Sequence, residues 1–172
     1  GRLRPEKNVR LLAKVDEELR KRNITGYKFL IVGDGSEEAF LREHLTNAHF
    51  TGVLRGEELA KAYANIDLFI FPSQTDAFGN VVLEAMASGV PSVVLPDNGP
   101  RFLIDQNVTG YVAEDETDLV RYSADFVADH ACLPEMQKAA RKRALEYSWQ
   151  RVFEKVYEYY EMGKTIDKSV RA

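Results

Sequence analysis

Two acidic side chains, Asp76 and Glu84, have seven residues between them in the stretch SQTDAFGNVVLEAMASGV, residues 73–90. No Lys or Arg occurs between Lys61 and Arg101, so neither acid has a positive partner nearby in the sequence. Glu84 also lies in a run that is otherwise small and apolar, where a charge is costly unless something hydrogen-bonds it. The sequence therefore indicates that a group from outside this stretch satisfies Glu84.

The start of the same helix is suited to an anion. Gly79 lets the backbone come close to a ligand, and the N–H groups of Asn80 and Val81 would point at a negative charge. Arg2 and Lys7, five residues apart, are cations of the kind that a pyrophosphate needs. Taken alone, these two residues are better explained as a solvated terminal arginine and an ordinary lysine in the first turn of a helix.

A nucleotide would also explain Glu84. This residue lies one turn beyond Asn80 on the same helix face, and its carboxylate can accept two hydrogen bonds from a diol such as the 2′ and 3′ hydroxyls of a ribose. The alternative is a hydrogen bond from a buried backbone N–H or from water. The sequence Val-Gly-Asp-Gly at 32–35 lacks the third glycine of a dinucleotide fingerprint, and we interpret it as a tight turn.

Apolar runs of strand length alternate with segments of helical periodicity. The expected strands are 27–32, 49–51, 67–71, 90–95 and 110–112, and the expected helices are 6–22, 36–45, 57–64, 79–87, 117–130, 135–146 and 149–162. Strands that are continuously apolar and followed by helices are typical of a parallel sheet covered on both faces. We predict an α/β fold, with one domain and a doubly wound, mostly parallel, Rossmann-like sheet.

The expected site lies beyond the carboxyl ends of these strands, where ligands of such sheets bind. Two local signals lie elsewhere. Ser36 is the expected N-cap of the helix at 36–45. The last helix has an apolar stripe that we interpret as a packing face, made of Trp149, Val152, Phe153, Val156, Tyr157 and Tyr160.

Composition restricts the function classes. The chain has 172 residues, 45% hydrophobic and 29% charged, as in a single globular domain with a core. Its net charge of −4 gives no general attraction to nucleic acid or anionic lipid. The single cysteine, Cys132, excludes a disulfide framework and a Cys-based metal site, and the three histidines lack metal-ligand spacing. No signal peptide or bilayer-length apolar run is present, and a cytoplasmic protein is expected.

These residues carry a resemblance to a known family. The matching segments are GRL-x-PEKN (1–8), VGDG (32–35), F-x-FPS (69–73), D-x-FGNVVLEAMASGVP (76–91) and TG (109–110). Together they resemble the group 1 glycosyltransferases, which are retaining, nucleotide-sugar-dependent enzymes of the GT-B fold. The match spans nearly the whole chain and is specifically to the C-terminal, donor-binding half of these enzymes.

The resemblance implies a role for each candidate residue. Asp76 matches the first acid of the family's E-x₇-E pair, which lies beside the transferred sugar. The implied donor-binding residues are Arg2 and Lys7 on the diphosphate, Asn80 and Val81 with their backbone amides, Phe78 and Gly79 in the same loop, Glu84 on the ribose, and the backbone near Leu54 facing the base.

The sequence departs from the family pattern at three places. Asp replaces the commoner Glu at position 76, which shortens the reach of the carboxylate. Asn8 stands where Gly is usual, and Asp97-Asn98-Gly99-Pro100 lacks one glycine of the usual Gly-Gly-Pro loop.

The reaction implied is transfer of a sugar, with retention, from a nucleoside diphosphate sugar to an acceptor hydroxyl. No D-x-D sequence occurs, so no metal and no other cofactor is indicated. The resemblance also implies that residues 1–172 form one nucleotide-sugar-binding domain of a longer protein. The first strand of that domain is expected upstream, as is an N-terminal domain that binds an acceptor glycan or lipid and through which alone the protein would associate with a membrane.

Two alternatives are left open, and a third, a glycosidase, is not favoured. A GT-B-fold sugar-nucleotide epimerase shares the architecture and the ribose acid, but the amino-acid sequence from Phe78-Gly79 to Glu84 argues against it. A non-catalytic nucleotide-binding module would have the same site without transfer. Paired acids also occur in ordinary glycosidases, which act without a nucleotide site.

Overall fold

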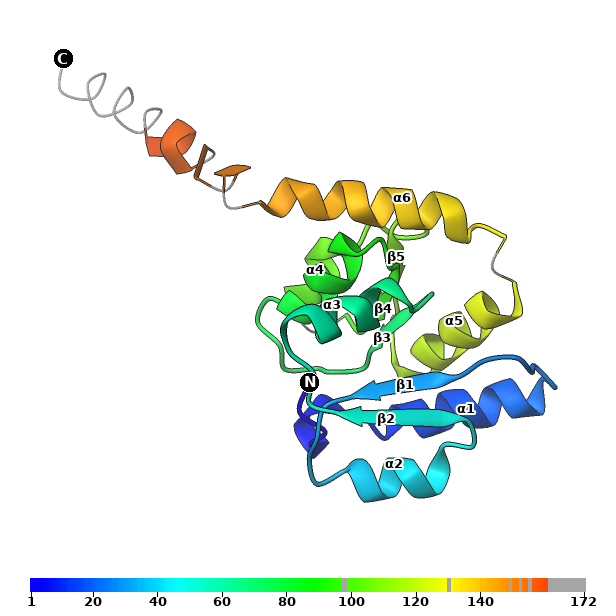
Figure 1. The fold of residues 1–172 in the computed structure, drawn as a ribbon. Helices are drawn as coiled ribbons and strands as arrows, with labels where there is room; N and C mark the ends of the chain where they lie inside the picture. Colours follow the sequence, from blue (N-terminus) through cyan, green and yellow to red (C-terminus); the bar gives the residue numbers. More distant parts are fainter. Residues whose placement is uncertain (97–98, 130, 149, 152, 155, 161–172) are drawn as a thin grey trace, which may run out of the picture.

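The computed structural model of the protein describes residues 1–160 except 97, 98, 130, 149, 152 and 155 (Figure 1). The strands are β1 (Phe29–Val32), β2 (Ala48–Gly52), β3 (Phe69–Phe71), β4 (Ser92–Val94) and β5 (Gly110–Val112). The α-helices are α1 (Leu11–Lys21), α2 (Glu38–His44), α3 (Gly56–Ala64), α4 (Asn80–Ala87), α5 (Glu116–Ala128) and α6 (Leu133–Ala144). Short 3-10 helices are η1 (Pro5–Lys7), η2 (Gly99–Leu103) and η3 (Leu145–Tyr147).

Every strand pair among these elements is parallel, as expected. The pairs form two sheets, β1-β2 and β3-β4-β5, so the single sheet predicted from the sequence is divided between β1 and β3. Residues 1–3 run along the end of β1: the Gly1 amino group donates to the Val32 carbonyl at 2.7 Å, and the Leu3 N–H donates to the Asp34 carbonyl at 2.7 Å. The start of the chain thus lies against the carboxyl end of β1 and the loop that follows it.

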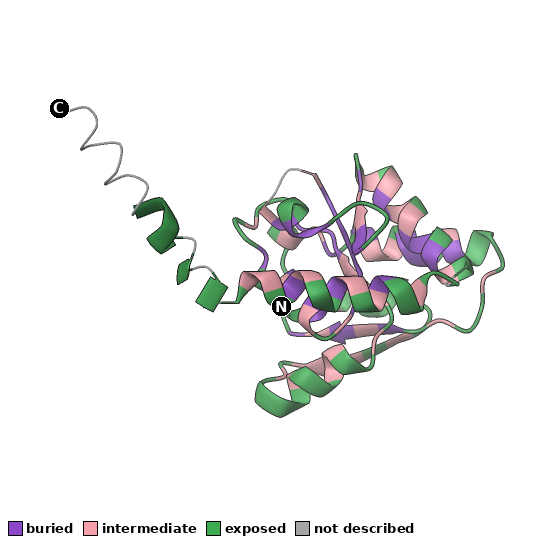
Figure 2. Ribbon diagram, turned by 90° about the horizontal axis from the view of Figure 1, so that it is seen from above, coloured by how far each residue is buried: buried purple, intermediate pink, exposed green. Residues whose placement is uncertain are grey.

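Helices cover both faces of β4, which is the signature of a doubly wound fold. Successive strand residues point to opposite faces, and fully buried Val93 and Val94 belong to different apolar clusters. Val93 packs in the cluster that includes α1, α2 and α5, whereas Val94 packs in the cluster that includes α4 and α6. Figure 2 shows this buried interior between outer surfaces that are exposed.

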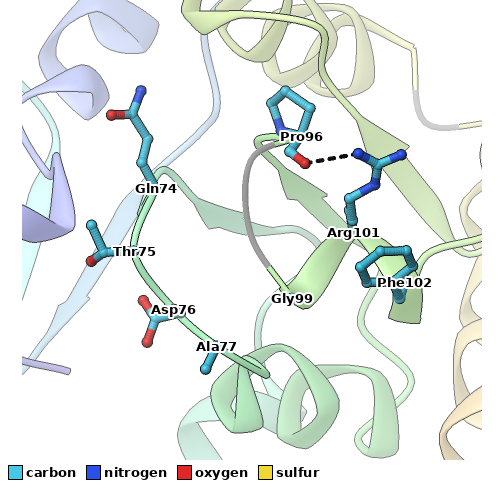
Figure 3. A pocket seen from close by; sticks show the side chains of 8 residues that line it. All are labelled: Gln74, Thr75, Asp76, Ala77, Pro96, Gly99, Arg101 and Phe102. Carbon is cyan, nitrogen blue, oxygen red and sulfur yellow. Dashed lines mark hydrogen bonds between the residues drawn. The ribbon is translucent and has the colours of Figure 1, made fainter.

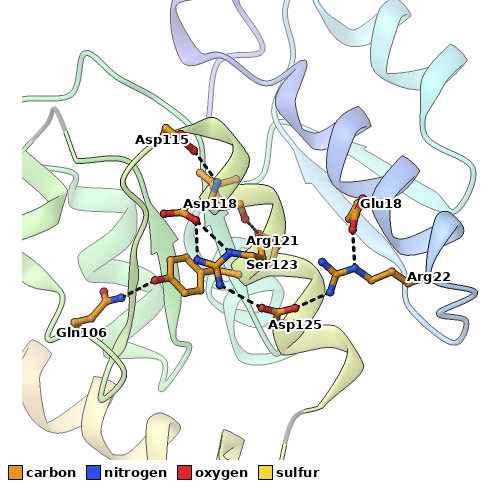
Figure 4. A network of polar contacts seen from close by, with 10 residues as sticks. Glu18, Arg22, Gln106, Asp115, Asp118, Arg121, Ser123 and Asp125 are labelled. Carbon is orange, nitrogen blue, oxygen red and sulfur yellow. Dashed lines mark hydrogen bonds and ion pairs between the residues drawn. The ribbon is translucent and has the colours of Figure 1, made fainter.

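A surface polar network joins α1 to α5 (Figure 4). Arg22, which caps the end of α1, donates to Glu18 at 2.6 Å and to Asp125 at 2.6 Å. On α5, Arg121 bridges Asp118 at 2.7 Å and Asp125 at 3.6 Å. Exposed pairs of this kind contribute little individually, so the packing of α1 on α5 rests mainly on buried side chains such as Val15.

The structure corrects some predicted local details. The helix expected at 6–22 is divided into η1 and α1 because Asn8 has a left-handed backbone (φ 50°) that ends the first turn. Ser36 does not cap α2; Glu37 precedes that helix and makes no side-chain capping bond. The other boundaries differ from the expected ones by a few residues at most, as is common for helix and strand ends.

The apolar side chains that the structure describes on the predicted C-terminal packing face are largely exposed. Phe153, Val156, Tyr157 and Tyr160 are all more than half exposed. Trp149, Val152 and the end of the predicted helix lie outside the described residues. Among the described residues, no helix combines the length and the apolar character needed to cross a membrane.

Candidate functional site

The glycines at 33 and 35 shape the site by letting the chain start pass close to them. Their φ angles are +127° and +152°, and a Cβ on either would collide with backbone atoms, of Gly1 at position 33 and of Leu3 at position 35. The glycines of the VGDG sequence therefore allow residues 1–3 to pass close to the end of β1, where the chain bends. This contact brings Arg2 to the loop that ends β1.

Lys7 and Asp76, 69 residues apart in sequence, meet at the centre of the site. Lys7 Nζ donates to Asp76 Oδ2 at 2.7 Å, and the buried Ser73 hydroxyl donates to the same oxygen at 2.5 Å. Burial alone would raise the pKa of Asp76, but these hydrogen bonds and the charges of Lys7 and Arg2 outweigh it and lower that pKa. Asp76 is therefore a carboxylate at neutral pH, and it does have a cationic partner, contributed by a distant part of the chain.

Asn8 directs Lys7 toward this position. Its left-handed backbone turns the chain directly after η1, and Asn is one of the few residues besides Gly that tolerates this conformation. Its side chain donates to Glu116 at 2.9 Å, which ties the turn to the start of α5. The departure from the usual glycine is thus accommodated without loss of the turn.

The loop before α4 is fixed by a close contact with η2. Gly79, buried with φ +81°, precedes α4, and a Cβ at this position would collide with the Pro100 ring. The Gly99 N–H donates to the Asp76 carbonyl at 3.0 Å, and a Cβ on Gly99 would collide with Ala77. Gly99 is therefore the glycine of the 97–100 loop that the close contact with Ala77 requires. Asp97 and Asn98, which include the missing glycine position, lie outside the described residues.

We expect Gly79→Ala to lower the free energy of unfolding by about 2 kcal/mol or more, because it adds a collision to the strain of a left-handed alanine. Gly26→Ala is the matched control, since Gly26 has φ +82° with no atom near its Cβ. Denaturant unfolding of both variants should show the larger loss for Gly79→Ala. Equal losses would contradict the close contact with Pro100.

An open cleft of about 560 Å³ lies beside Asp76. One wall is the loop after β3, and the other is formed by Pro96 and η2 (Figure 3). The residues that line the cleft are Gln74, Thr75, Asp76, Ala77, Pro96, Gly99, Arg101 and Phe102. Arg101, on the Pro96 and η2 side of the cleft, donates to the Pro96 carbonyl at 3.2 Å. A polar ligand with hydroxyl groups suits such a lining.

Glu84 is exposed on α4, and its partner is a tyrosine. Tyr63, near the end of α3, donates its hydroxyl proton to Glu84 Oε2 at 3.1 Å. Asn80 and Glu84 line one wall of a second cavity of about 440 Å³ between α4 and the end of α6.

The amides at the start of α4 complete the site. The N–H groups of Val82 and Leu83 donate to the Gly79 carbonyl at 2.9 and 3.2 Å, and the amides of Asn80 and Val81 precede them in the first turn. The first amides of a helix have no partner within the helix, which makes this end attractive to an anion.

The predicted site residues fall into two groups. Lys7 and Asp76 are in direct contact, with Arg2 close enough for its charge to act on Asp76. The others are placed by separate elements: Phe78 to Val81 at the start of α4, Glu84 on α4, and Leu54 half-buried in the loop between β2 and α3. Phe78 is 45% exposed, and its ring centroid lies 6.3 Å from that of Tyr147.

Sequence reasoning did not single out Ser73, Tyr63 and Arg101. Ser73 belonged to a quoted motif, but its bond to Asp76 depends on the loop conformation after β3. Tyr63 is 21 residues from Glu84, so no local spacing indicated their contact. In the described part of the chain, no group of three or more His, Cys, Asp or Glu side chains is arranged to hold a metal ion.

Comparison with known proteins gives the family. The sequence model described as glycosyl transferases group 1 matches residues 1–146. The chain is 34% identical over 162 residues to a GDP-mannose-dependent alpha-mannosyltransferase of Corynebacterium glutamicum, covering 93% of this chain and 38% of that protein. A protein of the same description from Mycolicibacterium smegmatis is 38% identical over 164 residues, covering 94% of this chain and 41% of that protein.

A solved structure agrees with this result. A crystal structure of a mutant of S. aureus TarM, in complex with UDP among other ligands, superimposes with a TM-score of 0.78 at 26% identity, covering 92% of this chain and 34% of that one. The chain thus spans about two fifths of the length of the two mannosyltransferases. The family match covers most of the chain, and the fold agrees with it: the chain belongs to the group 1 glycosyl transferases.

Proposed function

We propose that this chain is the donor-binding half of a retaining glycosyltransferase, which moves a sugar from a nucleoside diphosphate to an acceptor hydroxyl. The observation that carries the proposal is the meeting of Lys7 with Asp76 at the carboxyl end of the sheet, beside the start of α4. A cation, helix amides and a carboxylate converge there, as a diphosphate attached to a polar sugar requires.

Each group has a distinct task in the proposed reaction. Arg2, Lys7 and the amides of Asn80 and Val81 bind the diphosphate and stabilise the charge that develops on it as it leaves. Asp76, whose second oxygen faces away from the Lys7 bond, accepts a hydrogen bond from the transferred sugar. Glu84 accepts the ribose hydroxyls. Binding in this way orients the sugar for attack, which is the main contribution of a donor site to the rate.

The acceptor site belongs to another part of the enzyme in this proposal. The two mannosyltransferases are more than twice as long as the matched region. We therefore propose that an N-terminal domain binds an acceptor glycan or lipid, and that a strand before Gly1 continues along the β1 edge. The cytoplasmic location and the absence of a nucleic-acid partner stay predictions from the sequence.

The named relatives favour transfer over the alternatives. The Corynebacterium and Mycolicibacterium relatives are both described as mannosyltransferases, so the epimerase alternative is not supported. A non-catalytic nucleotide-binding module is distinguished by activity: the complete enzyme should release a nucleoside diphosphate in the presence of donor and acceptor, whereas such a module would not.

The test of the donor site is calorimetric titration of the protein with uridine, guanosine and adenosine diphosphates. At least one should bind with a dissociation constant below about 1 mM, a modest affinity for a preformed polar site. The matching nucleoside without phosphates is the control and should bind much more weakly, because the cations and helix amides would have no ligand. Absence of binding by all three diphosphates at millimolar concentration would refute the donor site.

The same binding should persist when divalent ions are chelated. Because Arg2, Lys7 and the start of α4 supply the positive charge, EDTA should change the dissociation constant by less than about twofold. Titrations with EDTA and with added magnesium check this expectation. Loss of binding in EDTA would mean that a metal ion neutralises the diphosphate.

A further inference from the structure

The partner of Glu84 is held in place by its own packing. Tyr63 is half-buried near the end of α3, and its ring meets that of Phe69 edge-on, with centroids 5.9 Å apart and an interplanar angle of 66°. Phe69 begins β3 and stacks in turn on Phe71, 6.0 Å away. The Tyr63 ring is therefore anchored to the sheet, and its hydroxyl reaches Glu84 Oε2 from a fixed direction.

The proton of this hydrogen bond belongs to the tyrosine. Burial raises the pKa of Tyr63 well above its usual value of 10.0, and the Glu84 charge and hydrogen bond raise it further. The phenol is consequently protonated throughout the neutral range, and the Tyr63 hydroxyl donates to the Glu84 carboxylate.

This bond constrains a side chain that is otherwise mobile. Glu84 is exposed, and an exposed glutamate samples many rotamers, which a ligand must restrict when it binds. Tyr63 restricts them beforehand by holding one carboxylate oxygen. Oε1 and the second lone pair of Oε2 stay available, which is enough for two hydroxyl donors.

We propose that Tyr63 is a positioning residue for nucleotide binding: its hydroxyl holds the Glu84 carboxylate in the orientation that accepts the ribose hydroxyls of a nucleoside diphosphate. This inference rests on the proposed function and adds to it a residue on α3. Tyr63 acts through Glu84 and does not itself touch the phosphates or the sugar.

Tyr63→Phe tests the inference, because it removes the hydroxyl and keeps the ring against Phe69. The probe is whichever of uridine, guanosine or adenosine diphosphate binds the unaltered protein most tightly. Its dissociation constant should rise by about fivefold, as for loss of one hydrogen bond, with little change in Tm. The rise should be smaller for the 2′-deoxy form of the same diphosphate, which has one hydroxyl fewer for Glu84 to accept.

Tyr27→Phe is the matched control. Tyr27 also donates to a carboxylate, Asp16 Oδ1, at 2.8 Å, but this acid is fully buried and bonded to Thr46 and Arg20. Removing the Tyr27 hydroxyl should lower Tm because it takes a donor from a buried charge, and should leave the nucleotide affinity unchanged. Tyr63→Phe is thus expected to change the dissociation constant with little change in Tm, whereas Tyr27→Phe is expected to lower Tm with no change in the dissociation constant.

Repeating Tyr63→Phe in a protein that already carries Glu84→Ala shows whether Tyr63 acts through Glu84. In Glu84→Ala, the added Tyr63→Phe change should alter the dissociation constant by less than about 1.5-fold, since coupled residues are non-additive. An undiminished fivefold loss in that background would overturn the inference, as would unchanged binding by Tyr63→Phe alone; both outcomes leave the proposed function intact. If the unaltered protein binds none of the diphosphates, the proposed function and this inference fail together.

Discussion

Asp76→Asn is expected to reduce sugar transfer by the complete enzyme by about a hundredfold or more, the size of effect seen when one preorganised electrostatic contact to a reacting group is removed. The affinity for the bare diphosphate should hardly change. The substitution keeps the shape of the side chain and removes its charge, and the bare diphosphate has no sugar to contact.

The geometry around Asp76 gives the reason. Lys7 and Ser73 both donate to Oδ2, which fixes the carboxylate and leaves Oδ1 directed to other partners. The lowered pKa of Asp76 keeps it charged at neutral pH. The competing explanation, that Asp76 caps α4, has no support in the structure, because Gly79 precedes α4 and no side chain makes a capping bond there.

Turnover and Tm of Asp76→Asn should be measured beside Asp118→Asn. Asp118 also pairs with a cation, Arg121, at 2.7 Å, but it lies on α5. The control should retain its turnover. Lost turnover with an intact Tm in Asp76→Asn supports the sugar contact, whereas unchanged turnover would refute it.

Glu84→Gln should weaken binding of a ribonucleoside diphosphate by about tenfold or more, because hydrogen bonds to a charged group are worth about 1.5–3 kcal/mol. The amide has one acceptor oxygen in place of two, and the Tyr63 hydroxyl competes for it. For a 2′-deoxy ligand the loss should be smaller, since one donor is already missing. Calorimetric dissociation constants for both ligands check this difference.

Glu135→Gln is the control for that experiment. Glu135 is an exposed glutamate on α6 that pairs with Lys138 at 2.8 Å, and its substitution should leave both dissociation constants unchanged. Equal losses for the ribo and deoxy ligands in Glu84→Gln would assign Glu84 a structural role instead of a ribose contact.

The sequence predicted the elements well because their signals are local. Continuous apolar runs gave β3, β4 and β5, and a glycine at each end delimited α4. The break at Asn8 was missed because helical periodicity continues through it, and side-chain periodicity does not report a left-handed φ at a single residue. The division of the sheet between β1 and β3 was missed because periodicity predicts strands, not which strands pair.

The sequence named candidate site residues one by one, but it did not predict their contacts. No cation lies near either acid in the sequence, which suggested that a ligand satisfies Glu84 and gave no protein partner for Asp76. Lys7 reaches Asp76 only because β1 and the VGDG turn position residues 1–8 beside the loop after β3. Tyr63 reaches Glu84 only because α3 packs against α4. Such contacts depend on the three-dimensional arrangement of distant segments.

The most direct test of the donor site is a crystal structure of the protein with a bound nucleoside diphosphate. We expect the phosphate oxygens within hydrogen-bond distance of Arg2, Lys7 and the amides of Asn80 and Val81, and the ribose hydroxyls on Glu84. A diphosphate bound elsewhere on the protein, or with its ribose turned away from Glu84, would contradict the assignment of this sheet edge as the donor site.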